Sequence, residues 1–324
     1  MPTRLVLAVL IVLAAPATAS AALVQTHIRT LQDDTGKGCT VVPEACTIVT
    51  LVFTADPGDA NRVQLTRDGS DVLVRDTGAK NLRAAGPGCK QENPNRVRCS
   101  PPEGPSTGIA FMDVELGDMD DVLDDEVTGT TALEAEGGPG DDQLSGGEGF
   151  DVLGGGAGAD RLEGGPFVDH LGDGVGGEGV EPDVMDGGDG ADRVSYARRT
   201  ARVTVNLAAA GPNAGQQGEA DTLTSVELVW GGRGPDVLRA GSAGVVFSGR
   251  GGNDQLVGGF GRDELEGDSG NDKLDGSFGR DRLWGGTGND RLRGGCDGDR
   301  VSGEEGRDRF FDADGSRDVL SGGA

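Results

Sequence analysis

The chain contains few of the residues that usually build an aromatic core or a catalytic site. Only 4% of its 324 residues are aromatic, and it has two histidines, one tyrosine and four methionines. Positive charge is also scarce, because 29 Lys and Arg face 55 Asp and Glu, which gives a formal net charge of −26 at pH 7. This acidity argues against nucleic acid as a partner, since nucleic-acid binding needs a basic patch. Such a chain is expected to be disordered unless a repeating pattern organises its apolar residues.

Long hydrophobic runs are missing except at the N-terminus. Arg4 is followed by an apolar segment over residues 5–15 and by small residues at 17–21, which is the pattern of a cleavable secretion signal. The segment is too short to span a membrane, and no later run approaches the roughly 18 apolar residues that a membrane helix needs. We therefore expect a signal peptide over residues 1–21 and a secreted, extracellular mature chain with no membrane span.

The cysteine pattern fits an oxidising compartment, with five cysteines in all. Cys39 and Cys46 are close enough in sequence to close a small loop, and so are Cys89 and Cys99, so we expect two disulfides. Cys296 stands at a variable position of the repeat described below. There we expect an unpaired surface thiol, and an intermolecular bridge is the alternative.

Glycine is abundant, with 60 residues, and recurs in a nine-residue unit. Between Gly231 and Phe311 the unit repeats nine times without insertion or deletion, in the form G-G-x-G-x-D-x-L-x shown by residues 258–266 and 285–293. Glycines at positions one, two and four permit positive φ and a tight turn. Positions seven to nine are long enough for a short strand whose middle residue points inward. These position-eight residues are all apolar, namely Leu238, Phe247, Leu256, Leu265, Leu274, Leu283, Leu292, Val301 and Phe310.

The aspartate at position six indicates a metal site. Two units make one coil, so equivalent aspartates should stack about 4.8 Å apart in two columns, Asp254 to Asp308 in one and Asp263 to Asp299 in the other. Stacked carboxylates repel each other, and a divalent cation between successive turns removes that repulsion; calcium prefers such hard oxygen ligands. The candidate ligands in the whole chain are Asp142, Asp151, Asp160, Asp169, Asp183, Asp192, Asp236, Asp254, Asp263, Asp272, Asp281, Asp290, Asp299 and Asp308.

Calcium should also be needed for folding. Ordering a residue costs roughly 1–2 kcal/mol in backbone entropy, whereas burying the single leucine of a unit returns only about 1.5–3 kcal/mol. Metal binding energy is then folding energy, so we expect the arrays to bind multiple calcium ions and to be largely disordered without them.

The chain divides into five segments. We expect a signal peptide over 1–21, an N-terminal β-rich cap over 22–108, a first array over 109–195, an interrupting longer β coil over 196–230, and a second array with a C-terminal cap over 231–324. The cap should contain strands at 46–54, 62–66 and 71–75, and the interruption longer strands at 202–207 and 222–229. In the first array Leu144, Leu153, Leu162 and Leu171 occupy position eight, and Phe167 replaces a glycine, which makes its turn doubtful. In the second, Val245 replaces the aspartate.

These repeats resemble the repeats-in-toxin (RTX) family of hemolysin-type calcium-binding repeats, over roughly 116–195 and 231–320. The resemblance implies an all-β fold, a parallel β-roll or β-helix solenoid with a small N-terminal β cap. It also implies that position-six aspartates and turn carbonyls bind calcium between stacked turns, and that export into a calcium-rich medium triggers folding. The N-terminal portion is similar to secreted actinobacterial calcium-binding proteins. A cleavable signal is a departure from the many family members that lack one, and it favours general secretion.

Catalytic motifs are sparse. The chain has no H-E-x-x-H zinc motif; His170 occupies an outward position where a solvated surface histidine is expected, and Ser269 stands at a variable repeat position without a nearby histidine. The position-seven residues Arg282, Arg291, Arg300 and Arg309 should form outward ladders that balance neighbouring carboxylates, or alternatively bind an acidic glycan or cell-surface polymer.

We therefore predict a secreted calcium-binding protein without enzymatic activity, in a structural or surface-interaction role. One alternative is a polysaccharide-modifying enzyme, a lyase or epimerase, built on the solenoid; its thin candidate cluster is Tyr196 with Arg198 and Arg199. Another is an adhesin, in which calcium rigidifies a stalk and the N-terminal cap binds a partner.

Overall fold

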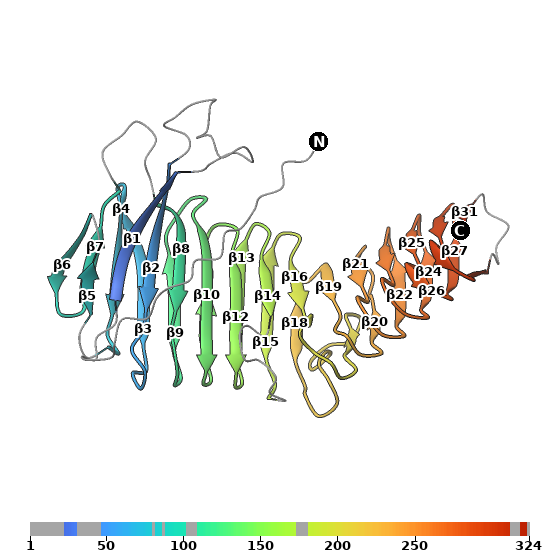
Figure 1. Ribbon diagram of the computed structural model, residues 1–324, viewed down its shortest axis with the longest axis horizontal. Helices are drawn as coiled ribbons and strands as arrows, with labels where there is room; N and C mark the ends of the chain where they lie inside the picture. The colour runs from blue at the N-terminus through green and yellow to red at the C-terminus, as the bar shows by residue number, and fades with distance from the viewer. Residues whose placement is uncertain are drawn as a thin grey trace.

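The protein is an elongated solenoid of stacked β-strands, running from an N-terminal cap, blue in Figure 1, to the red C-terminal coils. The computed structural model describes residues 23–30, 47–79, 82–85, 88–101, 109–172, 181–311 and 318–322, with the backbone alone at 23–30, 47–50 and 85. These residues contain strands and no helix, so none of them forms a helix able to cross a membrane. The expected signal peptide and the Cys39–Cys46 pair lie outside the described residues.

The N-terminal cap is built mainly from antiparallel strands. They are β1 (Leu23–Thr30), β2 (Thr47–Thr54), β3 (Arg62–Asp68), β4 (Asp71–Asp76), β5 (Arg83–Ala85), β6 (Cys89–Asn93) and β7 (Arg96–Cys99). A disulfide joins Cys89 to Cys99, which confirms that predicted pair. The cap merges with the solenoid, because β2 pairs in parallel with β8 and β3 in parallel with β9.

One face of the solenoid is a continuous 14-stranded sheet that starts in the cap with β5, β1 and β2. Parallel strands then follow one another along its length (Figure 1). They are β8 (Ile109–Glu115), β10 (Ala132–Pro139), β12 (Val152–Ala157), β14 (His170–Gly172), β16 (Arg193–Ser195), β19 (Leu228–Trp230), β21 (Val246–Ser248), β23 (Glu264–Glu266), β25 (Arg282–Trp284), β28 (Arg300–Ser302) and β31 (Val319–Ser321).

The opposite face is divided into two sheets. A nine-stranded sheet joins β6, β7, β4 and β3 of the cap to β9 (Val122–Glu126), β11 (Gln143–Ser145), β13 (Arg161–Pro166), β15 (Val184–Asp189) and β18 (Thr222–Thr224). A six-stranded sheet contains β17 (Thr204–Asn206), β20 (Val237–Arg239), β22 (Gln255–Phe260), β24 (Lys273–Phe278), β27 (Arg291–Cys296) and β30 (Arg309–Phe310). A small pair, β26 (Thr287–Gly288) and β29 (Glu305–Gly306), connects turns near the C-terminus.

The core is the column of position-eight side chains, as the repeat predicts. In the six-stranded sheet Leu238 pairs in register with Leu256, and Leu256 with Leu274, so one coil contains 18 residues. Every position-eight side chain from Leu238 to Val301 is at most 2% exposed, and only Phe310 at the C-terminal end is half-buried. Phe247, Leu265 and Leu283 stack in the same way in the 14-stranded sheet, and burial of these two columns between the sheets explains how a chain with few aromatics forms an ordered interior.

The interruption departs from the predicted strands. The long strand expected over 222–229 is wrong: Ser225 adopts a φ of 51°, so the chain turns there and the segment divides into β18 and β19 on different faces. The strand expected over 202–207 shortens to Thr204–Asn206. The 14-stranded sheet nevertheless passes through this region unbroken, because β19 pairs with β16 on one side and β21 on the other.

The turns show why glycine is needed at particular places. Gly270 has a φ of 149°, and a Cβ there would overlap the carbonyl oxygen of Gly252 in the preceding coil. The turn at Phe167, which the sequence left in doubt, forms nonetheless. Phe167 takes the left-handed φ of 89° that a glycine would have taken, and its ring is 52% exposed.

Candidate metal centre

The position-six aspartates lie at the end of each turn, directly before a strand. From Asp142 to Asp299 all of the predicted ligands are at most 5% exposed, although they are acidic; Asp308 is half-buried at the C-terminal end. The glycine-rich turn wraps around each carboxylate and removes it from water. Burying charged groups in this way is unfavourable unless each finds a partner.

One oxygen of each carboxylate holds the next coil in register. The backbone N–H of Asp254 donates to Oδ1 of Asp272 at 2.8 Å, and that of Asp272 donates to Oδ1 of Asp290 at 2.8 Å. On the opposite edge the N–H of Asp263 donates to Oδ1 of Asp281 at 2.9 Å. The first array repeats the arrangement, for example from Asp142 to Asp160 at 2.9 Å. The predicted stacking at 18-residue intervals is therefore confirmed.

The second oxygen of these carboxylates is buried without a hydrogen-bond partner among the described residues. Unsatisfied buried polar atoms are rare in proteins and call for a specific explanation. Here they recur in register along both arrays, at Oδ2 of Asp142, Asp151, Asp160, Asp169, Asp192, Asp254, Asp263, Asp272, Asp281 and Asp290.

Backbone carbonyl oxygens converge on the same places. A Cβ built on Gly267 would lie 2.5 Å from the carbonyl oxygen of Gly285 and 2.6 Å from Oδ2 of Asp272. On Gly285 it would lie 2.5 Å from Oδ2 of Asp290 and 2.7 Å from the carbonyl oxygen of Gly303. The first glycine of each unit thus leaves room for a cradle of carboxylate and carbonyl oxygens, which is the donor set that calcium takes.

Carbonyl oxygens must supply much of any coordination. Within the described residues no three Asp, Glu, His or Cys side chains come together as a metal-binding group. A cation between the turns would therefore be held by one or two carboxylates and by several main-chain oxygens. Such a site depends on the backbone conformation of the whole turn, so binding and folding should be coupled.

Burial strongly disfavours the charged form of these carboxylates. It raises the pKa of Asp254 to about 8, that of Asp272 to about 7 and that of Asp263 to about 6, from an ordinary value of 3.8. Neighbouring carboxylates raise the pKa of Asp254 and Asp272 further, while the N–H donated to each Oδ1 lowers it. Near neutral pH a bound cation would relieve this cost directly.

Three further acidic residues continue the columns and were missed by the sequence analysis. The N–H of Asp121 donates to Asp142, that of Asp183 to Oδ1 of Asp221, and that of Asp299 to Oδ1 of Asp318. Insertions displace all three from the regular spacing, with separations of 21, 38 and 19 residues. One feature of the sequence could have identified them, because each is followed two positions later by a leucine, as in the regular units.

Val245 and Glu227 stand at column positions where the regular units have aspartate. Val245 keeps only the backbone contact, since its N–H donates to Oδ1 of Asp263 at 2.9 Å. In the interruption Oε2 of Glu227 accepts the N–H of Asp192 at 3.1 Å, so a glutamate there accepts the hydrogen bond that an aspartate accepts in the regular units.

The candidate catalytic cluster is internal to the interruption. Tyr196 is fully buried and its hydroxyl donates to Oδ2 of Asp221 at 2.9 Å, while Arg199 is 4% exposed and forms an ion pair with Glu219 at 2.7 Å. Only Arg198 of the predicted trio is exposed. These contacts hold the wider coil together, so the three residues do not form a surface site.

His170 is not the solvated residue that the sequence predicted. Its Nδ1 lies 2.6 Å from Nη2 of Arg193, and the ring of Phe150 packs edge-on against it at 4.7 Å. Burial, with a smaller effect from Arg193, lowers the pKa of His170 to about 4. Ser269 is exposed, as expected, and its hydroxyl donates to the carbonyl of Arg250.

The predicted arginine ladders divide between two faces. Arg282 pairs with Arg300 in the 14-stranded sheet, and Arg291 pairs with Arg309 in the six-stranded sheet. Nη1 of Arg282 lies 2.7 Å from Oε1 of Glu264, which supports charge balance for that residue.

Comparison with known families identifies the repeated coils. The family model described as the RTX calcium-binding nonapeptide repeat matches residues 136–171, 179–197, 230–265, 248–283, 266–295 and 275–310. The overlapping matches fall in both arrays and leave the N-terminal cap outside. The search of curated proteins gives no match.

Proposed function

Because residues 136–171, 179–197 and 230–310 carry RTX calcium-binding nonapeptide repeats, we propose that the chain is a secreted protein whose coils fold on binding extracellular Ca²⁺. The folded β-roll then serves a structural or surface-interaction role. The repeat family supports calcium binding itself. We propose in addition that the position-six aspartates are the ligands, that calcium binding drives folding and that the chain is secreted.

The proposal is carried by the rows of buried Oδ2 atoms that have no partner among the described residues. Position-six aspartates of both arrays, such as Asp142, Asp272 and Asp290, would supply these oxygens, together with glycine carbonyls of the adjacent coil such as that of Gly285. Calcium, when bound, would supply the positive charge that these buried carboxylates lack. The chain's own turns position the oxygens and exclude water.

Two further observations support export. The disulfide between Cys89 and Cys99 requires an oxidising compartment to persist, and the N-terminal segment has the pattern of a secretion signal. Extracellular calcium is abundant enough for weak sites, which in extracellular modules have dissociation constants of about 10⁻⁴–10⁻³ M.

Circular dichroism of the mature chain during a calcium titration tests this function, with magnesium as the control ion. We expect a transition from coil to β-structure that saturates in the high micromolar to millimolar range and does not occur with magnesium. An unchanged, folded spectrum in excess chelator would show that the turns stand without metal.

A pair of variants localises the effect. Asp272→Asn keeps a side chain of the same size but removes the buried charge, so it should raise the calcium concentration at the midpoint. Asp275→Asn removes an outward carboxylate of the same unit, which among the described residues forms one ion pair, a 3.5 Å contact with Arg293, and should leave the midpoint unchanged.

A further inference from the structure

The N-terminal cap has a hollow on its outer face, outside the calcium repeats. Its volume is about 530 Å³, and it lies over β3, β4 and β7 and the turn after β6. Pockets of this size accommodate small ligands. Polar residues without a carboxylate dominate its described lining, among them Gln64, Thr66, Arg75, Thr77, Asn93 and Arg96.

Strand register places two of the cationic side chains directly beside each other. Gln64 on β3 lies opposite Arg75 on β4, Arg75 lies opposite Arg96 on β7, and Arg96 lies opposite Asn93 on β6. The row across four strands is therefore amide, guanidinium, guanidinium, amide. Like charges directly opposite each other destabilise an antiparallel pair, so this row favours an anion between the two arginines.

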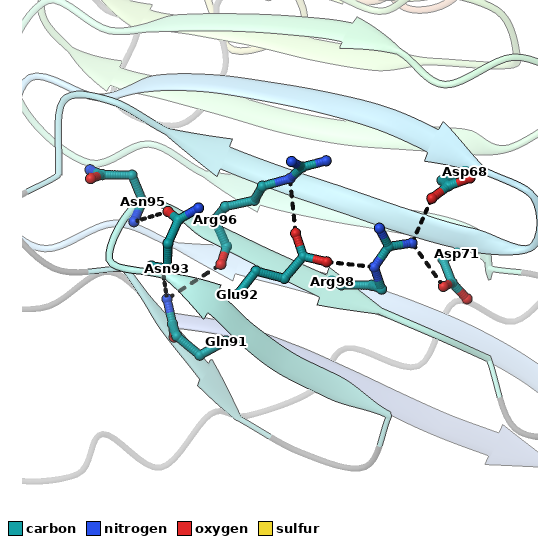
Figure 2. Close-up of polar contacts among 8 residues, drawn as sticks. All are labelled: Asp68, Asp71, Gln91, Glu92, Asn93, Asn95, Arg96 and Arg98. Carbon is teal, nitrogen blue, oxygen red and sulfur yellow. Dashed lines mark hydrogen bonds and ion pairs between the residues drawn. The ribbon is translucent and has the colours of Figure 1, made fainter.

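The carboxylates near the hollow form ion pairs mainly with Arg98 rather than with Arg75 or Arg96, as Figure 2 shows for Arg98 and Arg96. Arg98, the next outward residue of β7, contacts Asp68 at 2.8 Å, Asp71 at 3.1 Å and Glu92 at 2.7 Å. Glu92 also reaches Nε of Arg96 at 3.1 Å. Arg75 is exposed and makes no ion pair with any acidic residue in the described part of the chain. The three arginines around the hollow are therefore matched in number by Asp68, Asp71 and Glu92, and Arg75 is the arginine that none of these carboxylates contacts.

The polar groups around the hollow are held in place before any ligand arrives. Asn95 donates from Nδ2 to the carbonyl oxygen of Asp76 at 2.9 Å. Its backbone N–H donates to Oδ1 of Asn93 at 3.0 Å, as Figure 2 shows. Because Oδ1 of Asn93 is used in this way, its amide nitrogen is the group that offers donors to a ligand. The disulfide between Cys89 and Cys99 ties β6 to β7 at the end of the hairpin opposite to Asn93 and Arg96. A rigid support of this kind is what a binding site requires.

We propose that this hollow binds an anionic saccharide, with its carboxylate or sulfate between Arg75 and Arg96. Guanidinium groups bind planar or tetrahedral oxyanions through paired N–H donors. The flanking amide of Asn93 and the hydroxyls of Thr66 and Thr77 match the hydroxyls of a sugar, while Nε2 of Gln64 donates to Oε1 of Glu126 at 3.1 Å. The described lining contains no aromatic residue on which a nucleic-acid base could stack.

This proposal places the glycan-binding site in the N-terminal cap, whereas the sequence suggested the arginines of the second array. The position-seven arginines considered in the sequence analysis lie on two different faces, and one of them is paired with Glu264. The role of the hollow in the cell rests on the proposed surface-interaction function, but the binding site itself uses none of the calcium ligands. The cap would hold the polymer and the calcium-loaded coils would act as the rigid body behind it.

Isothermal titration calorimetry of the full mature chain at a fixed, saturating free calcium concentration tests the proposal. The probes are digalacturonate for the carboxylate, a monosulfated galactose disaccharide for the sulfate ester, and neutral cellobiose as control. We expect one or both anionic probes to bind and cellobiose not to bind. Binding of neither anion at millimolar concentration, or equal binding of cellobiose, would overturn the proposal.

Matched variants connect binding to the arginine pair. Arg75→Gln should weaken the binding of the anionic probe at least tenfold, and Arg75→Lys should restore it only in part because the guanidinium fork is lost. Arg161→Gln changes the net charge equally, at an exposed position of the first array, and should alter affinity less than twofold. Equal affinity of the Arg75→Gln and Arg161→Gln variants would refute the assignment. The calcium midpoint of both variants, measured by circular dichroism, should equal that of the wild type, so a failure of the calcium proposal would be recognised separately.

Discussion

Gly285→Ala should damage the protein by filling the oxygen cradle while leaving every carboxylate in place. Gly285 lies outside the left-handed region, so alanine can adopt its backbone conformation. Its new Cβ, however, would lie 2.5 Å from Oδ2 of Asp290 and 2.7 Å from the carbonyl oxygen of Gly303. Ordinary contacts of a Cβ are 3.4–4 Å, so one of these two oxygens must move away from the proposed calcium position.

The expected loss of stability has two parts. Forcing a methyl group into a filled site costs about 1–3 kcal/mol. Losing one calcium ion, at a concentration 100 times its dissociation constant, removes about 2.7 kcal/mol more. A glycine-to-alanine change without steric conflict would instead stabilise the fold by about 0.4–1 kcal/mol through the unfolded state. With that gain subtracted, we expect Gly285→Ala to destabilise the calcium-loaded array by about 3–5 kcal/mol, opposite in sign to an unhindered glycine.

Urea unfolding at saturating calcium, followed by tryptophan fluorescence, measures this difference, because Trp284 precedes the substituted residue. Gly251→Ala is the control, since the nearest atom to its new Cβ is the flexible Oγ of Ser269 at 3.3 Å and its φ is also not left-handed. Hydrogen exchange should show the added flexibility in the coils around residue 285, because each coil contacts mainly its neighbours. Equal stability of the two variants would refute the oxygen cradle.

Three further predictions concern pH, the disulfide and a strained turn. Burial raises the pKa of Asp254 to about 8 and of Asp272 to about 7 from 3.8, so the metal-free fold binds protons more tightly than the unfolded chain. Its stability should be greatest below about pH 4 and should fall as the pH rises through 6–8; circular dichroism in chelator would contradict this if β-structure increased toward neutral pH. Cys89→Ser should destabilise the cap by about 2–3 kcal/mol, measured by urea unfolding, and a reducing agent should then lower the stability of the wild type more than that of the variant. Phe167→Gly should stabilise the first array by about 1 kcal/mol, because Phe167 holds a left-handed φ of 89°; an unchanged urea midpoint would contradict this.

The regular part of the molecule could be predicted because its spacing is constant. The 18-residue register gives each position-eight leucine the same buried environment and each aspartate the same neighbour. Where insertions change the spacing, the columns continue but the pattern in the sequence does not, which is why Asp121, Asp221 and Asp318 were missed.

Other features depend on contacts between distant segments. The cap joins the solenoid through pairing of β2 with β8 and of β3 with β9, and no local pattern encodes that register. The hollow exists because four strands bring Gln64, Arg75, Arg96 and Asn93 into one row. The burial of His170 likewise follows from Arg193 and Phe150 in neighbouring coils.

The unit with Ala240 and Val245 shows that positions one and six are coupled. In the regular units of both arrays an aspartate at position six accompanies a glycine at position one; this unit lacks both, and Ala240 and Val245 are each buried. The carboxylate oxygen occupies the space that a Cβ would need, so loss of the aspartate permits the methyl group. A double-mutant cycle of Gly285→Ala with Asp290→Val should therefore give a coupling energy of about 1–3 kcal/mol in calcium, with alanine costing little once the carboxylate is gone. Additive effects of the two substitutions would mean that Gly285 is needed for the turn itself rather than for the oxygens gathered around it.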